Sequence, residues 1–317
     1  MKKILVTGAS SFVGQALCSS LLMQGYVIRA AVRSSDSMEP FGGLDVVVVG
    51  EVGAQTDWSA ALQGVDCVIH CAARAHVMHE KEADALVAYR AVNVAGTQRL
   101  AEQASLLGVR RLVYLSSIKV NGEQTAPGSP FLFSDAPAPE DPYGLSKFEA
   151  EQALWAVSAQ TGLQVVVVRP PLVYGPWVKG NLLRLLRLVA FGVPLPFGAL
   201  RNQRSLVGLS NLVDLLLLCA ECPAAANQTF LVSDGEDLST TDLLRRLGKA
   251  LHKSSCLLPV PSSVLEVGAQ LVGKRAVAQR LLGNLQVDIS RTREVLDWSP
   301  PVSVDEELKK TANWFLS

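Results

Sequence analysis

Two residues of the sequence are spaced for proton transfer. Tyr143 and Lys147 stand four positions apart, directly after Pro142, in a segment whose pattern predicts a helix over 143–161, so both fall on one helical face. A tyrosine has an unperturbed pKa of about 10, and exchanging a proton near neutral pH requires lowering it by about 3, or roughly 4 kcal/mol. The ammonium of Lys147, together with a positively charged nicotinamide in the oxidised form, can supply that change.

A hydroxyl group precedes this helix at the end of a predicted strand. The strand 111–116 ends at Ser116 and Ser117, and ligands of parallel sheets bind at the carboxyl ends of the strands. Ser117 can hydrogen-bond a carbonyl or hydroxyl oxygen and share its proton with Tyr143. A Tyr and a Lys at this spacing occur on many helices, but together with Ser117 they describe hydride and proton transfer at one carbon.

The elements that must position these residues alternate between strand and helix. The strand-like runs are continuously apolar, which indicates strands buried on both faces, as in a parallel sheet between two helix layers. We therefore predict an α/β fold with a Rossmann-type doubly wound parallel sheet. The predicted strands are 4–7, 27–32, 46–49, 67–71, 111–116 and 165–169, and the predicted helices are 12–24, 58–62, 83–107 and 143–161.

The first strand leads into the segment TGASSFVG, residues 7–14, and then into a helix. Backbone N–H groups and the positive helix end suit a pyrophosphate there, as in a dinucleotide site. Gly8 makes the tight turn and Gly14 lets helix and strand pack closely, whereas Ser11 stands where a middle glycine is usual. The Ser11 hydroxyl either donates a hydrogen bond to phosphate or holds the cofactor slightly away. A merely structural strand-helix turn is the alternative.

The end of the second strand bears on which cofactor binds. An acidic residue there would bind the ribose 2′-hydroxyl and repel a 2′-phosphate, but this chain has Val32, Arg33 and Ser34. The pattern favours NADP(H), with NAD(H) as a possibility, and the alternative is that Arg33 is a solvated surface cation. Glu51 and Val52, which end the third strand, are expected to contact adenine.

After Arg169-Pro170 the pattern changes to apolar helices broken by prolines. This predicts a smaller C-terminal mixed α/β domain that binds the substrate. We expect the dinucleotide-binding domain to span 1–170 plus about 205–233, and the substrate-binding domain to span 171–204 and 234–317.

Composition excludes several classes of partner. Lys plus Arg and Asp plus Glu both count 29, so no net field favours nucleic acid or an anionic membrane. The longest apolar run, 212–220, is too short for a membrane span of about 20 residues. The six cysteines sit mostly in apolar runs of a chain that opens on a strand, so we expect a cytoplasmic protein with reduced thiols. We expect no metal site at Cys219 and Cys222 or at His76, His79 and Glu80.

These segments together resemble the extended short-chain dehydrogenase/reductase family, in its nucleotide-sugar epimerase, dehydratase and reductase branch. Two departures from its usual pattern are Ser11 and the strand end RAAVR, which looks like the NADP-using dihydroflavonol-reductase branch. The matching pieces are TGASSFVG, DCVIHCAA at 66–73, NVAGT at 93–97, YLSSIKVNG at 114–122, YGLSK at 143–147, RPPLVYGP at 169–176 and RSLVGLSNLVD at 204–214.

The resemblance implies roles for individual residues. Ser117 is implied as the catalytic hydroxyl, Tyr143 as the acid/base, and Lys147 as both the tyrosine tuner and a ligand of the nicotinamide ribose. A homodimer through the helices 83–107 and 143–161 is implied as well. The implied cofactor contacts are Gly8, Ser10, Ser11, Phe12, Val13, Gly14, Arg33, Ser34, Glu51, Val52, Cys71, Ala72, Ala73, Asn93, Ser116, Tyr143, Lys147, Pro170, Leu172 and Val173, with Asn93 either structural or in the site.

The resemblance also implies how a nucleotide diphosphate is held. Asn181 and Arg204 match an asparagine and an arginine that clamp it, and Arg280 is expected to reach the second phosphate. The alternative for Arg204 is an inter-domain salt bridge. Leu195 and Phe197 are expected to form an apolar slot for a uracil ring. The residues expected beside the reacting sugar are Arg74, His76, Ser117, Lys119, Asn121 and Tyr143.

An exchangeable NADPH suits net reduction. We therefore expect an NADPH-dependent reductase. The resemblance to enzymes of bacterial surface polysaccharide, such as O-antigen or lipopolysaccharide, implies that it reduces the C4 carbonyl of a UDP-4-keto-6-deoxy-N-acetylhexosamine, of the UDP-N-acetylquinovosamine type. The first alternative is a UDP-sugar 4-epimerase that uses the same residues with a tightly held NAD. The second is a non-catalytic dinucleotide sensor.

Overall fold

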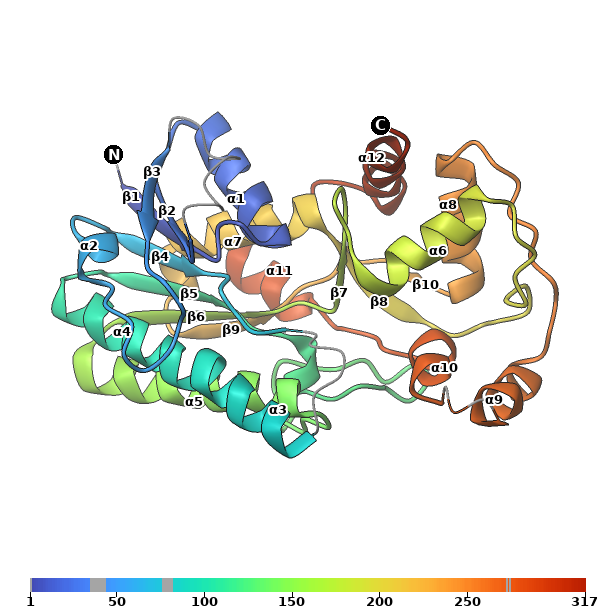
Figure 1. Ribbon diagram of the computed structural model, residues 1–317, viewed down its shortest axis with the longest axis horizontal. Helices are drawn as coiled ribbons and strands as arrows, with labels where there is room; N and C mark the ends of the chain where they lie inside the picture. The colour runs from blue at the N-terminus through green and yellow to red at the C-terminus, as the bar shows by residue number, and fades with distance from the viewer. Residues whose placement is uncertain (1, 35–43, 76–81, 272, 274) are drawn as a thin grey trace.

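A computed structural model of the protein describes residues 2–34, 44–75, 82–271, 273 and 275–317. The chain forms two lobes, a larger one that contains the N-terminus and a smaller one (Figure 1). The last helix, α12 (Val304–Leu316), packs against α8 (Thr240–Ala250) of the smaller lobe. No helix in the described part of the chain has both the length and the apolar character needed to cross a membrane.

The larger lobe is built on a parallel sheet. Within the described residues it has seven strands in the order β3-β2-β1-β4-β5-β6-β9, and every neighbouring pair is parallel. In β6 five of six residues are buried, as expected for a strand covered on both faces. The predicted Rossmann-type doubly wound fold is confirmed. The strands are β1 (Lys3–Thr7), β2 (Val27–Val32), β3 (Asp45–Val48), β4 (Cys67–His70), β5 (Arg111–Leu115), β6 (Gln164–Arg169) and β9 (Gln228–Leu231).

Helices cover both faces of this sheet, and each layer has its own core. One core contains residues of α1 (Phe12–Met23), α7 (Leu209–Glu221) and α11 (Ser290–Leu296). The other contains residues of α2 (Ser59–Leu62), α4 (Thr97–Leu106) and α5 (Pro142–Thr161). Because α11 packs against β9, part of the segment predicted for the substrate domain returns to the larger lobe.

The helix predicted over 83–107 is interrupted by a wider turn. The structure has α3 (Glu82–Tyr89), a π-helical segment η3 (Arg90–Gly96) and then α4. A Cβ atom at Gly96 would lie 2.6 Å from Cγ1 of Val52, so this segment can pack closely because residue 96 is glycine. The wide turn also places Asn93 in the interior, where it is 1% exposed.

The smaller lobe has a mixed sheet and its own core. In the described chain its three strands follow the order β10-β8-β7, with β7 parallel and β10 antiparallel to β8. The prediction grouped β8 with the dinucleotide domain, but β8 pairs within this small sheet. The elements of this lobe are β7 (Leu172–Tyr174), α6 (Gly180–Ala190), β8 (Arg204–Gly208), β10 (Asp237–Leu238), α8, α9 (Ser262–Leu271), α10 (Arg275–Leu282) and α12.

Candidate active site

Ser117 lies just beyond the carboxyl end of β5, the end that faces the smaller lobe (Figure 1). It is the N-cap of a short 3₁₀ helix, η4 (Ile118–Val120), and its Oγ lies 3.3 Å from the backbone nitrogen of Lys119. A hydroxyl oxygen that accepts this bond still has its proton to donate. Ser117 is therefore positioned to donate a hydrogen bond to an oxygen at the sheet edge.

The helix that carries Tyr143 starts at a well-defined cap. Oδ1 of Asp141 accepts a hydrogen bond from the backbone nitrogen of Gly144 at 2.6 Å, and Pro142 opens the helix. A Cβ atom at Gly144 would lie 2.7 Å from the carbonyl oxygen of Lys119. The first turn of α5 can therefore lie directly against η4, which places Tyr143 near the Ser117 segment.

Lys147 is buried behind the tyrosine, with 2% of its surface exposed. Its Nζ donates to the carbonyl oxygen of Leu115 at 2.8 Å and lies 4.5 Å from the ring centroid of Tyr114 and 6.0 Å from that of Tyr143. Burial lowers the pKa of Lys147 to about 8. The cation is thus held beside both the strand end and the tyrosine.

The protein's own groups raise the pKa of Tyr143. Burial raises it above the usual value, and the charges of Asp141 and Tyr89 raise it further. The ammonium of Lys147 lies 6.0 Å from the ring centroid, and the lowering expected from Lys147 together with an oxidised nicotinamide stays a prediction. The protein's own groups thus hold Tyr143 in its protonated form, in which it can donate a proton.

A buried ion pair lies beneath the candidate site, and we call it with its two polar neighbours the Glu151 network. Glu151 on α5 accepts from Arg169 of β6 at 3.0 and 2.5 Å and from Oγ of Ser116 at 2.5 Å. Arg169 also donates to Oδ1 of Asn121 at 2.9 Å, and Asn121 donates to the carbonyl oxygen of Leu132 at 3.2 Å. The network joins the ends of β5 and β6 to the helix of Tyr143 and Lys147.

This geometry changes the interpretation of two predicted site residues. Ser116 was predicted to contact the cofactor and Asn121 the substrate, but each is 3% exposed. The Ser116 hydroxyl donates to Glu151, and both ends of the Asn121 amide have partners within the protein. Their side chains support the site from below and are not free to bind a ligand.

Sequence reasoning missed His70 as well as Glu151 and Arg169. Nδ1 of His70 lies 2.6 Å from Oγ1 of Thr7, and Nε2 lies 2.9 Å from Oγ1 of Thr97. Burial, and next the charge of Lys147, lower the pKa of His70 to about 3, so the ring is neutral. The sequence held signals for two of these residues, since His70 stands within an apolar strand and Glu151 follows Lys147 by one helical turn.

The start of α1 answers the question raised by Ser11. Ser11 is the N-cap of α1, and its Oγ accepts from the backbone nitrogen of Gly14 at 3.1 Å. The first turn has no acidic residue, and the first amides of a helix, here those of Phe12 and Val13, point outward without intrahelical partners. Ser11, in the place of the usual glycine, therefore caps the helix with its hydroxyl oxygen and can still donate its hydroxyl proton to a bound anion.

The turn before α1 requires glycine. Gly8 has φ of +63°, and a Cβ atom there would lie 2.7 Å from backbone atoms of Ala72. Cys71 is buried and Ala72 half-buried, while Ala73 and Ser10 are exposed. The close contact between two strand ends, together with outward amides and a first turn of α1 that has no acidic residue, fits the pyrophosphate of a dinucleotide.

Arg33, which was predicted to contact a 2′-phosphate, forms an ion pair with Glu51. Nη1 of Arg33 lies 3.7 Å from Oε1 of Glu51, and the two side chains are 71% and 84% exposed. Ser34 is exposed and Val52 is buried. An ion pair this exposed is weak, so Arg33 is free to move toward a phosphate.

Asn93 holds the segment after β4 against α5. Its Oδ1 accepts from the nitrogen of Arg74 at 2.8 Å, and its Nδ2 donates to the carbonyl oxygen of Arg74 at 3.1 Å and to Oγ of Ser146 at 2.9 Å. Asn93 was predicted to be either a structural residue or a site residue, and these hydrogen bonds fit the structural role. Arg74 is half-buried, and His76 lies outside the described residues.

The segment after β6 continues along the same edge. The carbonyl oxygen of Pro170 accepts from the nitrogen of Ile118 at 2.9 Å, which ties this segment to η4. Leu172 is exposed and Val173 half-buried, so both remain accessible from the region of Ser117.

Lys119, predicted to face the sugar, is neutralised by two acids. Its Nζ lies 2.5 Å from Oε1 of Glu123 and also pairs with Asp141. Since Asp141 caps α5, Lys119 braces the start of the helix that carries Tyr143 and is not free for a ligand.

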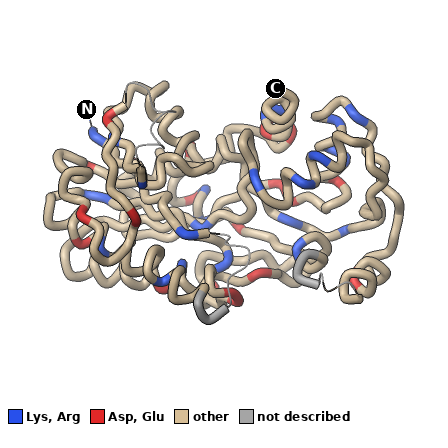
Figure 2. Tube along the Cα trace, in the orientation of Figure 1, with Lys and Arg blue, Asp and Glu red and all other residues tan. Residues whose placement is uncertain are grey.

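The cations predicted to bind phosphate lie in the smaller lobe. Arg204 is half-buried, and its Nη1 donates to the carbonyl oxygen of Gly283 at 3.0 Å, with no carboxylate partner among the described residues. Burial, and next the charge of Arg280, lower the pKa of Arg204, so the charge of Arg280 acts on Arg204. Asn181 is exposed at the start of α6. Figure 2 shows the Lys and Arg positions of α6 and of the start of β8 in this lobe.

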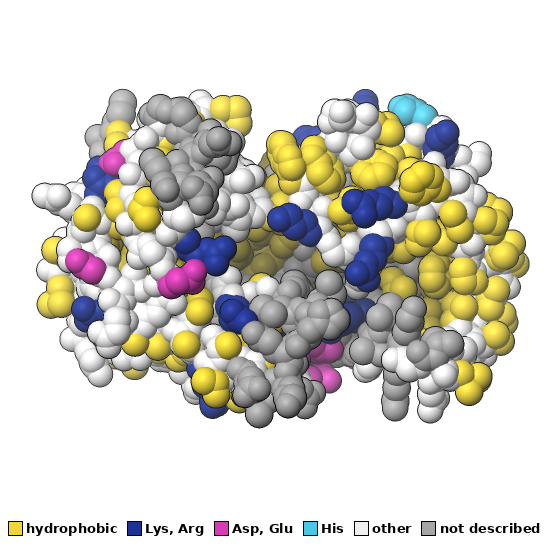
Figure 3. Space-filling view, in the orientation of Figure 1, with side chains coloured by type: hydrophobic (Ala, Val, Ile, Leu, Met, Phe, Trp, Pro, Cys, Tyr) yellow, Lys and Arg dark blue, Asp and Glu magenta, His cyan; other side chains and the backbone are white. Residues whose placement is uncertain are grey.

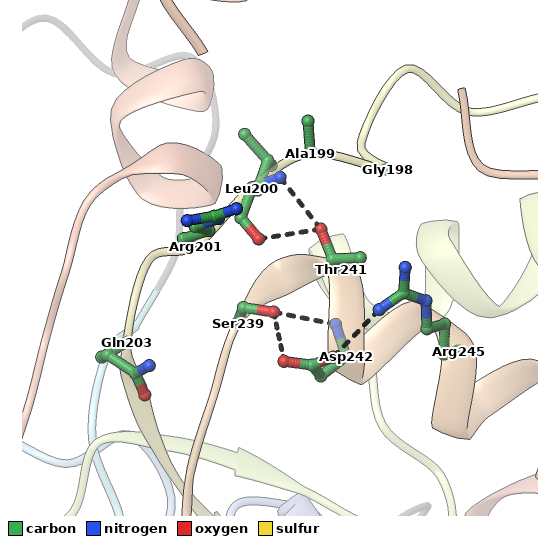
Figure 4. Close-up of a pocket in the computed structure, with 9 residues that line it drawn as sticks. All are labelled: Gly198, Ala199, Leu200, Arg201, Gln203, Ser239, Thr241, Asp242 and Arg245. Atoms are coloured by element: carbon green, nitrogen blue, oxygen red, sulfur yellow. Dashed lines mark hydrogen bonds and ion pairs between the residues drawn. The ribbon is translucent and has the colours of Figure 1, made fainter. Parts of the chain in front are cut away.

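The predicted uracil slot is only partly present. Leu195 is 5% exposed, and its backbone pairs with Cys256 and Leu258 at 2.8 Å, so it belongs to the core of the lobe. Phe197 is half-buried and is the accessible member. The loop that joins Phe197 to Arg204 lines a pocket of about 580 Å³ (Figure 4). Its lining residues are Gly198, Ala199, Leu200, Arg201, Gln203, Ser239, Thr241, Asp242 and Arg245.

Known proteins resemble this chain over its whole length. A model of the NAD dependent epimerase/dehydratase family matches residues 4–233. The chain belongs to this family. A UDP-glucose 4-epimerase of Vibrio cholerae is 50% identical over 317 residues, which cover 99% of this chain and 96% of that protein. The family confirms the predicted extended short-chain dehydrogenase/reductase class, an enzyme that uses a nicotinamide dinucleotide.

More distant relatives share the fold. An N-acetyl-alpha-D-glucosaminyl-diphospho-ditrans,octacis-undecaprenol 4-epimerase of Escherichia coli O157:H7 is 26% identical over 86% of this chain and 81% of its own. The solved UDP-glucose 4-epimerase of Thermotoga maritima with UDP-glucose has a TM-score of 0.77 and 22% identity, covering 99% of this chain and 98% of that one. The UDP-glucuronic acid 4-epimerase of Bacillus cereus with NAD has a TM-score of 0.79 and 22% identity over the same shares.

Proposed function

We propose that the protein is a UDP-sugar 4-epimerase that works with a nicotinamide dinucleotide. The observation that carries this proposal is the intact set of Ser117, Tyr143 and Lys147 at the sheet edge, in a chain 50% identical to a UDP-glucose 4-epimerase over nearly its full length. This function was the first alternative in the sequence analysis, and the whole-length similarity now favours it over the reductase.

The chain's own residues account for the proton movements of such a reaction. When bound, the nicotinamide supplies or accepts hydride at the sugar carbon. Tyr143 donates a proton to the C4 oxygen as its phenol, and it would accept the proton of a C4 hydroxyl only as its phenolate, the form that Lys147 together with an oxidised nicotinamide would stabilise. Ser117 donates a hydrogen bond to that oxygen. Lys147 stabilises negative charge on the phenol, and its ammonium would donate hydrogen bonds to the hydroxyls of the cofactor ribose.

Recognition of the substrate is assigned to the smaller lobe. The charge of Arg280 acts on Arg204, and Arg204 has no carboxylate partner among the described residues. Two guanidinium groups in this arrangement suit an anion such as a diphosphate, which accepts paired hydrogen bonds from each. Asn181 and Phe197 complete the proposed nucleotide contacts.

A second candidate function is the NADPH-dependent reduction of a UDP-4-keto-6-deoxy-N-acetylhexosamine. The specific observation in its favour is Arg33 at the end of β2, where an acid would reject the 2′-phosphate. The neighbouring Glu51 opposes it, because its carboxylate lies 3.7 Å from Arg33. A surface polysaccharide pathway, a homodimer, the stated domain boundaries and a cytoplasmic location remain predictions.

One experiment separates the two functions. Purified protein is incubated with UDP-glucose or UDP-N-acetylglucosamine without added cofactor, and the 4-epimer is measured by chromatography. In parallel, loss of NADPH or NADH absorbance is followed with a UDP-4-keto-6-deoxy sugar. Epimer formation without net cofactor consumption supports the epimerase. Consumption of NADPH with no epimer would instead establish the reductase, and the Tyr143→Phe variant is the blank for both assays.

A further inference from the structure

Exposed apolar side chains gather at the outer end of the smaller lobe. The loop after α6 pairs with the loop after α8, since the nitrogen of Leu195 donates to Cys256 and that of Leu258 donates to Leu195, both at 2.8 Å. These paired loops expose Phe191, Val193 and Leu258. Figure 3 shows hydrophobic side chains covering this end of the lobe.

The helix α9 follows Leu258 in the chain and is also exposed. None of its ten residues, all of them described, is buried. Val264, Val267 and Leu271 are exposed and recur at helical spacing, so they lie on one face, and Leu271 is 82% exposed. We call Phe191, Val193, Leu258, Val264, Val267 and Leu271 the distal apolar face. Exposed apolar side chains that gather at one end of a lobe mark an interaction site more often than isolated ones do.

The charges around this face are strongly asymmetric. The whole chain has equal numbers of basic and acidic residues, 29 of each. The two segments that carry the face, 179–201 and 249–271, contain six Lys or Arg residues and one acid, Glu266. None of the six forms an ion pair with another residue that the structure describes. The six are Lys179, Arg184, Arg187, Arg201, Lys249 and Lys253, and all are exposed.

We propose that the distal apolar face docks on an anionic membrane surface. Apolar side chains next to unpaired cations are the composition of segments that lie in the bilayer interface, where the apolar groups enter the acyl boundary and the cations meet anionic headgroups. The neutral net charge of the chain conceals this local excess. The docking is peripheral, since no described helix can span a membrane.

A second copy of the chain fits the distal apolar face less well than an anionic membrane does. A two-fold interface would place the same surface of both copies together, so the unpaired cations of one would face those of the other. An anionic bilayer neutralises them instead. The face is also separate from Ser117, Tyr143 and Lys147, so docking leaves the candidate site outside the bilayer.

The test is sedimentation of the full-length protein with lipid vesicles. One vesicle type is phosphatidylcholine alone, and the other contains about one third phosphatidylglycerol. We expect binding to the anionic vesicles only, and loss of it at about 1 M salt, where the screening length falls to about 3 Å. Each cation near the surface contributes about five-fold in binding, so Arg187→Gln with Lys253→Gln should weaken it by about 25-fold.

Matched controls separate docking from general surface effects. Leu271→Ser should weaken binding, whereas Met23→Ser, at an equally exposed position of the larger lobe, should not. Arg110→Gln, also in the larger lobe, is the control for charge. The proposal is overturned if the wild type does not sediment, if it binds both vesicle types equally, or if test and control variants behave alike. It is also overturned if Leu271→Ser dissociates an oligomer in sedimentation velocity while the wild type binds no vesicles.

Discussion

Removing the charge of Glu151 should destabilise the protein strongly. The side chains of Arg169 and Glu151 are only 7% and 2% exposed, and their closest atoms lie 2.5 Å apart. In the Glu151→Gln variant the guanidinium of Arg169 stays buried without its countercharge. Breaking such a buried pair from one side costs about 3–5 kcal/mol, because the remaining charge has lost both water and partner.

The size of the effect on melting temperature follows from the length of the chain. Unfolding entropy is about 2.1 cal/mol/K per residue, which for 317 residues gives roughly 0.67 kcal/mol/K if the chain unfolds as one unit. A loss of 3–5 kcal/mol therefore lowers the midpoint by about 4.5–7.5 °C. Thermal unfolding followed by circular dichroism measures this change, and urea unfolding gives the free energy independently.

The same helix offers a matched control. Glu149 pairs with Arg90 at 2.5 Å, but these side chains are 23% and 48% exposed. Glu149→Gln should cost less than about 1 kcal/mol, or under about 2 °C. The double variant Glu151→Leu with Arg169→Met should recover much of the lost stability, since both buried charges are gone. Equal effects of Glu151→Gln and Glu149→Gln would refute the reasoning.

Three further predictions concern the site. Tyr143→Phe should lower kcat by about 10²–10⁴-fold with cofactor binding retained in a fluorescence titration, and an active variant would contradict its proton-transfer role. The folded-state pKa of Lys147 is lowered to about 8, below its unfolded value of about 10.4. Activity should therefore fall as the pH rises through about 8, because Lys147 loses its charge. The free energy of unfolding should rise between about pH 8 and 10.4, because the unfolded chain binds more protons there. A Lys147→Met variant that kept that rise in stability would exclude Lys147 as its source. Arg204→Gln should raise KM for UDP-glucose by about 10–100-fold with little change in kcat, and an unchanged KM would remove Arg204 from phosphate binding.

The candidate catalytic residues could be predicted because their placement depends on local rules. Four positions along a helix bring Tyr143 and Lys147 to one face, and a strand end in a parallel sheet brings Ser117 to the ligand edge. The pKa of Tyr143 could not be predicted this way. It depends on burial, on Asp141 and on Tyr89, and Tyr89 comes from another helix.

The cofactor motif was likewise predicted in part from the sequence and in part only from the structure. The glycines at 8 and 14 and the apolar strand predicted a strand-turn-helix, which the structure has, and its binding of pyrophosphate stays a prediction. The function of Ser11 required coordinates, because only they show its hydroxyl capping α1 at Gly14. Arg33 likewise favoured NADP(H) in sequence, and only the structure revealed Glu51 beside it.

By itself the sequence indicated the family through its motifs, the doubly wound sheet through its apolar period, and Ser117, Tyr143 and Lys147 as candidates for the chemistry through short spacing. Only the tertiary structure decided which polar residues are free to bind a ligand. Ser116, Lys119 and Asn121 find their partners 35, 22 and 48 positions away, at Glu151, Asp141 and Arg169. A hydrogen bond closed by folding leaves no mark in the local sequence, so side chains that appear available along the chain are already engaged within the folded protein.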